Sequence, residues 1–430
     1  MAPAAKAPEI ATNAPEARGE GGLRTSFFPE GRKLAIEAAI IAGLVAVGAV
    51  AAYFITRDTI DNKRPVAGAN HAVGLLGFDQ SQYSFATTDG KTLVGASNDT
   101  GGEVLDIFAS RDGGETWTRT DGPVVPGSCA HGAPQVAALP GGGEVVAFLG
   151  APQCGRFQSL QPFLVTSTRA TPTGAWTPIR RVVPTAWEYG FDDAPSLAAS
   201  RDGKRVYLAW NRSYDKLTAT IAVSTSTDGG ATWSAPVQVS GALVHPHLVT
   251  TTVADDGTLY VAGIDAKHGL WATRSTDGGR TFAPPVAVAK LLGNQSASCA
   301  QTADQPLPRE LRQCSGPDPT IVVQRDHVLI VYSDFAANQT TDIYVAGLDR
   351  SLHKQFTRHV SPPDTSKTQQ FAPVAAVDAT TGTAWACWYD TTYDPNAKRV
   401  WFTCSASHDG RRWTPPLAAA SQESTIDDIF

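Results

Sequence analysis

The stretch TLVGASND, residues 92–99, is an apolar run that favours a β-strand and ends in polar residues. Five more segments align with it without gaps: EVVAFLGA (144–151), RVYLAWNR (205–212), TLYVAGID (258–265), HVLIVYSD (327–334) and TAWACWYD (383–390). Each copy has a strand-like run before it and another after it. Three or four short strands repeated about every 50–60 residues are typical of the blades of a β-propeller. The sequence therefore predicts an all-β protein with a six-bladed β-propeller.

The repeats set the expected domain limits. We expect the propeller over residues 80–427, with blades at about 80–127, 131–185, 194–240, 245–291, 316–363 and 371–421. We expect residues 56–79 to form a linker and closing strand. TIM-barrel and doubly wound folds are disfavoured, because no amphipathic helices of 10–15 residues separate the strands.

A second motif follows the third strand of several repeats. It reads SRDGGETW at 110–117, STDGGATW at 226–233 and STDGGRTF at 275–282, with a shorter copy, SHDGRRW, at 407–413. In a turn of this kind the Asp and Ser side chains form hydrogen bonds with backbone groups, Gly adopts positive φ, and the aromatic ring packs below. Calcium or ligand binding at these Asp residues is the functional alternative. The residues assigned to the motif are Ser110, Asp112, Gly114, Trp117, Ser226, Asp228, Gly230, Trp233, Ser275, Asp277, Gly279, Phe282, Asp409 and Trp413.

The S-x-D-x-G-x-x-W motif resembles the Asp-box, or BNR repeat, of the sialidase superfamily, whose fold is a six-bladed propeller. The resemblance covers residues 80–427, with a decayed box near Gly174-Ala175-Trp176 in blade 2 and none in blade 5. Asp-boxes also occur in other propellers and in proteins without catalytic activity, so they indicate the fold more than the activity.

The resemblance implies a catalytic pattern that this chain matches only in part. Sialidases bind the substrate carboxylate with three arginines and use a Tyr nucleophile assisted by Glu, with an Asp as acid and base. No Arg lies between Arg64 and Arg111, where the family carries its first arginine. Asp99 follows the second strand of blade 1, where the family places its acid/base; a turn-capping Asp is the alternative. Tyr214 and Tyr393 are the candidate nucleophiles.

In a propeller, the loops after the second strands and those before the first strands meet at one end, which usually carries the ligand site. Acids, histidines and aromatic residues gather there, and carboxylates in this setting suit either acid/base catalysis or the capping of turns. We predict no metal and no cofactor, because no cofactor motif occurs. The predicted ligand-binding residues are Arg156, Arg212, Glu188, Asp193, Asp265, His247, Asp334 and Asp390.

The N-terminal region predicts a membrane anchor. Residues 1–33 have the composition of a disordered segment, which we expect to be a cytoplasmic tail. Residues 34–55 form an apolar run of 22 residues, which as a helix of roughly 33 Å would cross a bilayer core. A signal peptide cleaved near residues 49–51 is the alternative. We expect a single-pass protein of the cell membrane, with its propeller on the extracytoplasmic side.

Six cysteines after this run indicate an oxidising compartment. No C-x-x-C spacing typical of zinc or redox sites occurs. We expect the pairs Cys129–Cys154, Cys299–Cys314 and Cys387–Cys404, the last across two adjacent strands. Six unrelated buried thiols are the alternative.

Charge limits the possible partners. The formal net charge is -6, so the basic surface of a nucleic-acid-binding protein is absent. Two functions stay open: a glycan-binding propeller acting as an exo-glycosidase, and a non-catalytic propeller that binds a protein or peptide partner in the cell envelope. The absent first arginine and the acids near the mouth predict that a neutral or cationic group binds better than free sialic acid.

Overall fold

The computed structural model describes residues 80–99, 104–127, 130–151, 162–183, 191–213, 219–239, 243–292, 317–335, 340–361, 368–392, 394, 399–420 and 423–425. The chain divides into two compact units, 1–64 and 65–430, and every described residue belongs to the second. The predicted tail, the apolar run 34–55, the linker 56–79 and the cysteines at 129, 154, 299 and 314 lie outside the described residues.

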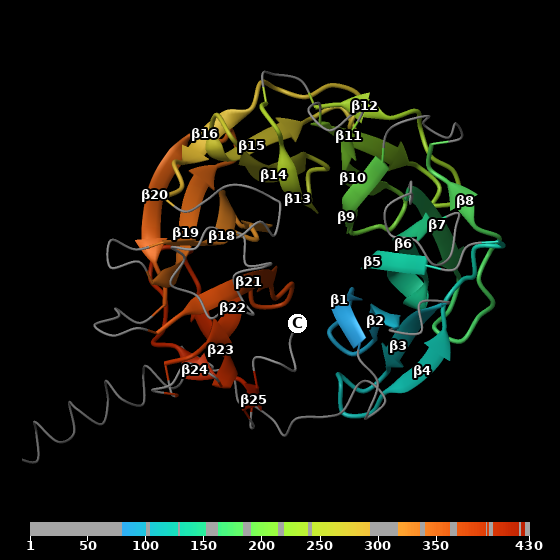
Figure 1. Cartoon of the computed structure of the whole chain (residues 1–430), viewed down its shortest axis with the longest axis horizontal. Helices are drawn as coiled ribbons and strands as arrows, with labels where there is room; N and C mark the ends of the chain where they lie inside the picture. Colours follow the sequence, from blue (N-terminus) through green and yellow to red (C-terminus); the bar gives the residue numbers. More distant parts are fainter. Residues whose placement is uncertain are drawn as a thin grey trace, which may run out of the picture. The chain divides into compact units, whose positions relative to one another are not determined.

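The described part is a six-bladed β-propeller, as the repeats predict (Figure 1). Blades 1 to 3 contain β1 (Gln80–Thr87), β2 (Leu93–Asp99), β3 (Leu105–Ser110), β4 (Thr118–Asp121); β5 (Ala130–Ala138), β6 (Glu144–Ala151), β7 (Phe163–Arg169), β8 (Arg180–Arg181); and β9 (Phe191–Ala199), β10 (Val206–Ser213), β11 (Ala219–Ser226), β12 (Val237–Gln238). A single 3-10 turn, η1 (Pro140–Gly142), joins β5 to β6.

Blades 4 to 6 repeat the same order. They contain β13 (His247–Val253), β14 (Leu259–Asp265), β15 (Gly269–Ser275), β16 (Val286–Ala289); β17 (Thr320–Gln324), β18 (His327–Phe335), β19 (Thr341–Asp349), β20 (Lys354–His359); and β21 (Gln370–Val377), β22 (Ala384–Asp390), β23 (Arg399–Ser407), β24 (Leu417–Ala418), with β25 (Ser424–Thr425) also paired to β23.

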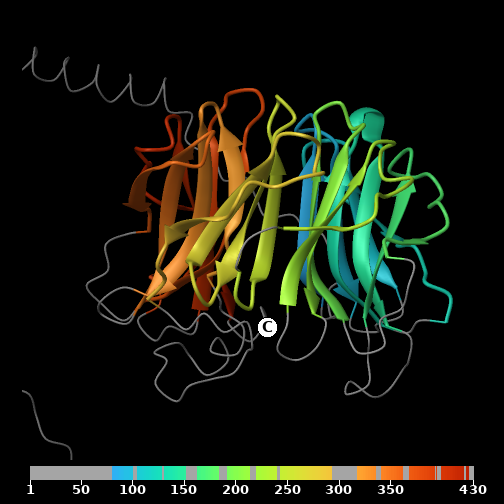
Figure 2. The ribbon, with the colours of Figure 1, turned by 90° about the horizontal axis from the view of Figure 1, so that it is seen from above.

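Each blade is an antiparallel sheet whose four strands follow one another in sequence from the axis outward. All five described strands of blade 6 come from the C-terminal part of the chain, so its described sheet contains no N-terminal strand. Figure 2 shows the blades edge-on, with the strands running between the two ends of the ring.

The innermost strands carry a repeated irregularity. In blades 2 to 6 the residues Ala133, Ala194, Leu248, Asp318 and Ala372 have positive φ between 38° and 51°. A proline follows four of them, and the pairing with the second strand shifts at this point in blades 2, 3, 4 and 6. Such β-bulges bend a strand and redirect its side chains. Here they bring one segment of each innermost strand to the axis.

The sheets bury their faces against one another, and apolar clusters fill five of the six spaces between neighbouring blades. Large rings such as Trp210, Trp271 and Trp388 are fully buried in these clusters. Between blades 6 and 1 the described residues form only a small cluster around Phe371 and Val400, both of blade 6. Among the described residues, the junction between the last and first blades therefore has the smallest apolar cluster.

The structure confirms one of the predicted disulfides and describes no membrane-spanning helix. The Cys387–Cys404 disulfide is confirmed: the two residues lie opposite each other on β22 and β23 and are bonded. Among the described residues no helix is long and apolar enough to cross a membrane, and the run 34–55 is not among them.

Candidate functional site

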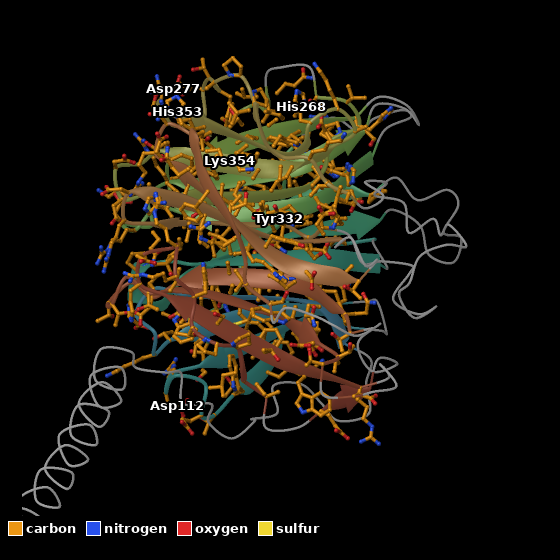
Figure 3. All side chains as sticks on the ribbon, turned by 90° about the vertical axis from the view of Figure 1, so that its left-hand side faces the viewer. Asp112, His268, Asp277, Tyr332, His353 and Lys354 are labelled. Carbon is orange, nitrogen blue, oxygen red and sulfur yellow. A yellow bond between two sulfur atoms is a disulfide. The ribbon has the colours of Figure 1, made fainter. Side chains whose placement is uncertain are left out.

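The ends of the second strands and the starts of the innermost strands lie at one end of the ring, here called the mouth. Arg212 of β10 pairs in register with Asp192 of β9, and Asp390 of β22 pairs with Gln370 of β21. The turns with the S-x-D-x-G motif lie at the opposite end, here called the box end. Figure 3 shows this separation, with Asp112 and Asp277 at one end of the strands and His268 toward the other.

The structure describes six of the predicted site side chains: Arg212, Asp193, Asp265, His247, Asp334 and Asp390. Arg156, Glu188, Tyr214 and Tyr393 lie outside the described residues, and β2 ends at Asp99 without a described side chain. The roles assigned to these five residues stay predictions.

Arg212 is the predicted ligand-binding arginine that the structure describes, and it forms part of a buried group. Its Nε lies 3.8 Å from Oδ1 of Asp192, and both side chains are buried. Trp210 Nε1 donates a hydrogen bond of 2.7 Å to the same carboxylate oxygen. Burial raises the pKa of Asp192, while the Trp210 hydrogen bond and the Arg212 charge lower it. An acid beside it therefore already balances the charge of Arg212.

Asp193 differs from its neighbour because its side chain is exposed. The backbone N–H of Ala194 donates a 2.7 Å hydrogen bond to its Oδ1. The pKa of Asp193 is nevertheless raised, because the surrounding protein removes part of the water that would stabilise the charge. A carboxyl that solvent can reach but that holds its proton more tightly than usual is suited to acid catalysis.

The residues that follow Asp193 help to line a cavity of about 390 Å³. Every blade contributes to this lining from its innermost strand or from the residues just before it, so the cavity lies on the axis of the ring. Its lining contains one carboxylate and no cationic side chain among the described residues: Tyr83, Ala133, Pro134, Gln135, Ala194, Pro195, Leu248, Val249, Asp318, Pro319, Thr320 and Pro373.

In blade 4 the acid of the mouth caps a turn. Asp265 is fully buried and accepts hydrogen bonds from the backbone N–H groups of Val244, at 2.9 Å, and His268, at 2.6 Å. Nδ1 of His268 lies 2.9 Å from its Oδ2. His247 donates from Nδ1 to the carbonyl oxygen of His245 at 2.9 Å, since a carbonyl can only accept. Nε2 of His247 is therefore the nitrogen without a proton when the ring is neutral.

In blade 6 the acid at the mouth, Asp390, also accepts hydrogen bonds from its own turn. Asp390 is buried, and its Oδ1 accepts hydrogen bonds from Gln370 Nε2 at 3.1 Å and from the backbone N–H of Thr392 at 2.8 Å. Trp388 Nε1 lies 3.4 Å from the other oxygen. These contacts fit the capping alternative stated for the acids that end second strands.

Blade 5 holds a cluster of acids and rings of which the sequence indicated only Asp334. Asp334 and Asp342 lie opposite each other on β18 and β19, and so do Tyr332 and Tyr344, whose rings are stacked 5.8 Å apart. Burial and the charges of Asp342 and Asp334 raise the pKa of Tyr344 to about 12. The backbone N–H of Leu292 donates to both oxygens of Asp334, at 3.0 and 3.1 Å. The contact of this cluster with Leu292, which lies 42 residues before Asp334 in the chain, cannot be read from one sequence.

A histidine adjoins this cluster but does not form a Ser–His–Asp relay. Nε2 of His359 lies 2.9 Å from the hydroxyl of Ser361 and 3.4 Å from Oδ1 of Asp342. A relay needs the nucleophile and the acid at different nitrogens of the ring, whereas here both face the same one. Within the described ranges no group of three or more His, Cys, Asp or Glu side chains could hold a metal ion.

The S-x-D-x-G turns have the geometry expected of structural turns. In the first copy Ser110 Oγ donates to Asp112 Oδ1 at 2.8 Å, and the N–H of Gly114 donates to Ser110 Oγ at 2.9 Å. The N–H of Thr116 donates to Asp112 Oδ1 at 2.9 Å, and Trp117 Nε1 donates to the carbonyl of Gly114. The hydrogen bonds from Thr116 lower the pKa of Asp112 to about 2. The second and third copies repeat this pattern, so the carboxylates accept bonds from their own turns.

Blade 2, whose box has decayed, uses an ion pair at the same position. Arg169 ends β7 where Ser110 ends β3, and it pairs in register with Glu144. Both side chains are buried and their charged groups are in contact. The guanidinium also lies 4.5 Å from the ring centre of Trp176, the aromatic residue left from the box.

No protein-family model and no curated protein matches this sequence. Among solved structures it is similar to a protein of unknown function from Dyadobacter fermentans, with 14% identity and a TM-score of 0.51 over 76% of this chain and 94% of that one. It is also similar to the Trypanosoma rangeli sialidase, with 11% identity and a TM-score of 0.47 over 74% and 53%. A third is the GH93 alpha-L-arabinofuranosidase of Fusarium graminearum, with 12% identity and a TM-score of 0.47 over 72% and 88%.

At these identities the likeness concerns the fold and not the site. The chain has the fold of a six-bladed β-propeller, with the S-x-D-x-G turns at the box end.

Proposed function

We propose that the propeller binds a neutral glycan at its mouth and in the axial cavity below it. The observation that carries this proposal is the lining of the cavity, which combines an aromatic ring, an amide, a hydroxyl and the carboxylate of Asp318 without a described cationic side chain. An anionic sugar needs a guanidinium or ammonium partner for its carboxylate. The described arginine of the mouth, Arg212, is buried beside Asp192.

The binding test compares glycans that differ by one charge. We expect neutral glycans from an array, such as lactose and arabinan oligosaccharides, to include ligands that bind the full-length protein. For each ligand the sialylated counterpart should bind about tenfold more weakly, because the described lining of the cavity holds the carboxylate of Asp318 and no cationic side chain. Asp318→Asn should reduce the difference in affinity between the neutral and the sialylated forms, because it removes the carboxylate charge of the cavity. Equal or tighter binding of the sialylated forms would show that the proposed ligand class is wrong.

Hydrolysis is a second candidate function, and the raised pKa of the exposed Asp193 favours it. In glycoside cleavage one carboxyl group must donate a proton to the leaving oxygen. We propose Asp193 as that acid, beside the sequence-based candidate Asp99. Fluorogenic neutral glycosides and sialosides should be tested on the wild type, Asp193→Asn and Asp99→Asn. Turnover that only Asp99→Asn abolishes would exclude Asp193 as the acid, and no turnover of any substrate would leave binding as the function.

We also propose that the propeller lies outside the cytoplasm, anchored by residues 34–55. The Cys387–Cys404 disulfide supports an oxidising compartment, where such bonds persist. Protease added to intact cells or spheroplasts should digest the propeller and spare the tail. Peptide mapping without reductant should find the two further predicted bridges, Cys129–Cys154 and Cys299–Cys314. A soluble mature protein beginning near residue 52 would contradict the anchor, and free thiols would contradict the compartment.

A further inference from the structure

The box end carries a groove that is separate from the mouth. It has a volume of about 570 Å³ and lies between the outer parts of blades 3 and 4. This volume falls within the range of small-ligand sites. Thr227, Thr232 and Ser234 place hydroxyl groups along it, and Trp233 contributes its ring. Trp233 Nε1 donates inward to Thr166 Oγ1 at 2.9 Å, so the polar edge of the indole is already bonded.

Two guanidinium groups border this groove from different blades. Arg205 is exposed, and its guanidinium has no hydrogen-bond or ion-pair partner among the described residues. It lies over the turn of blade 4, because a Cβ added at Gly278 would be 3.4 Å from one of its terminal nitrogens. Arg280 is also exposed, and its Nε donates to the carbonyl of Asp277 at 2.8 Å, which fixes the side chain at the groove.

The acid of the groove, Asp277, does not neutralise these arginines. Its Oδ1 accepts from Ser275 Oγ and from the N–H groups of Arg280 and Thr281, at 2.8 to 3.1 Å, and its Oδ2 accepts from Thr281 Oγ1 at 2.6 Å. These bonds, chiefly those from Thr281, lower its pKa, so the carboxylate is charged but satisfied within its own turn. The arginines therefore keep donors for a ligand, and Arg binds planar carboxylates through two parallel hydrogen bonds.

We propose that this groove binds an acidic saccharide. The two guanidinium groups would hold a sugar carboxylate, and the flank of Trp233 would contact the apolar face of the sugar ring. The hydroxyl protons of Thr232 and Ser234 are already donated to Asp228 and Ala235, so their oxygens would accept hydrogen bonds from sugar hydroxyl groups. The groove is at the opposite end from the mouth, so this site is additional to the one proposed there.

The test uses a probe whose charge can be removed without changing its ring. A trisaccharide of galacturonic acid is titrated into the full-length protein by calorimetry, beside its methyl ester and inorganic sulfate. We expect the acid form to bind and the ester to bind at least tenfold more weakly. Arg205→Gln and Arg280→Gln should each weaken binding of the acid form about tenfold. Sulfate should bind more weakly than the trisaccharide, since it contacts the guanidinium groups alone.

Two control variants separate this site from other charge effects. Arg201→Gln removes an exposed charge from the same turn region of blade 3, outside the groove, and should change binding less than twofold. Asp193→Asn alters the mouth only and should leave binding of the trisaccharide unchanged. Ester binding that falls in Arg205→Gln as much as binding of the acid form, an equal loss in Arg201→Gln, equally tight sulfate, or no binding of the acid form would each overturn the proposal. Melting curves of all variants confirm that they remain folded.

Discussion

At the scale of single residues, the acids of this propeller differ in what their oxygens accept. Asp112 and Asp277 accept hydrogen bonds from Ser, Thr and backbone donors of their own turns. Asp265 and Asp390 accept bonds from the loops that they cap. Asp193 accepts a hydrogen bond from the backbone N–H of Ala194 and remains exposed. Aspartates thus cap turns at both ends of the ring, and Asp193 at the mouth is the one of these five that is exposed beside the axial cavity.

The turn acids predict how stability changes with pH. The pKa of Asp112 is about 2 in the folded protein, below its ordinary value of 3.8, because Thr116 and Ser110 donate to the ionised form. A group with a lowered folded pKa contributes stability above its ordinary pKa, and that contribution is lost as the pH falls through the folded value. We expect the melting temperature to fall between pH 4 and pH 2, and to fall less in Asp112→Asn. Melting curves across this range test the expectation, and identical pH profiles for both proteins would contradict it.

The buried pair Glu144–Arg169 predicts a large effect of a single substitution. Both side chains are almost fully buried, at 0% and 2% exposure. Arg169→Met should lower the free energy of unfolding by about 3–5 kcal/mol, because it leaves a buried carboxylate without its partner. Glu144→Leu combined with Arg169→Met should recover much of that loss. Denaturant titration of the two variants measures both effects.

The pH dependence of the single variant gives an independent check. Burial raises the pKa of Glu144 even with Arg169 present. The stability of Arg169→Met should therefore be greatest below the ordinary Glu pKa and fall as the pH rises through the raised value. A double variant as unstable as Arg169→Met alone would show that lost packing around Arg169, and not the unpaired charge of Glu144, causes the loss of stability.

At the scale of elements, glycines in the box turns let neighbouring blades approach closely. Gly230 has φ of 90°, and a Cβ there would lie 2.8 Å from Cγ2 of Val145 in blade 2. Gly90 has φ of 71°, and a Cβ there would meet nothing within 4 Å. Alanine at either position would have a side chain at positive φ, but only alanine at position 230 would add a contact between blades.

These two glycines form a matched pair for a stability measurement. Gly90→Ala should cost about 1–2 kcal/mol from backbone strain alone. Gly230→Ala should cost a further 1–3 kcal/mol, roughly, because the methyl group overpacks the face of blade 2. Denaturant titration gives both values. Equal losses would mean that Val145 moves away without cost and that the blades are less rigidly packed than the structure indicates.

At the scale of the whole propeller, the junction of blades 6 and 1 differs from the other five. Tyr83 and Phe85 of β1 and Val374 of β21 are each about half exposed, whereas the corresponding faces elsewhere lie in apolar clusters. Hydrogen bonds link the innermost strands at four other junctions, such as the bond from Val136 N–H to Ser84 Oγ between blades 1 and 2.

We therefore expect the ring to open first at this junction. Local opening requires little free energy where few apolar contacts are lost. In hydrogen–deuterium exchange the amides of β1 and β21 should exchange faster than those of β13 and β17, the innermost strands of blades 4 and 5. Uniform protection of all six innermost strands would contradict this expectation and would mean that the last junction is as stable as the others.

The sequence by itself determined the six blades, their order and the turns at the box end. Local physics governs these features: alternating apolar runs select strands, and Ser, Asp and Gly at fixed offsets select the turn. The pairing of Cys387 with Cys404 also followed from the sequence, because adjacent strands joined by a short loop have one main register. Only the tertiary structure decided which polar groups meet. The pairing of Arg212 with Asp192, the contacts around Asp334 and Asp342, and the approach of Arg205 to Gly278 join residues from different strands or blades. Their charges depend on burial and on partners distant in the chain, and a single sequence does not encode either in its local pattern.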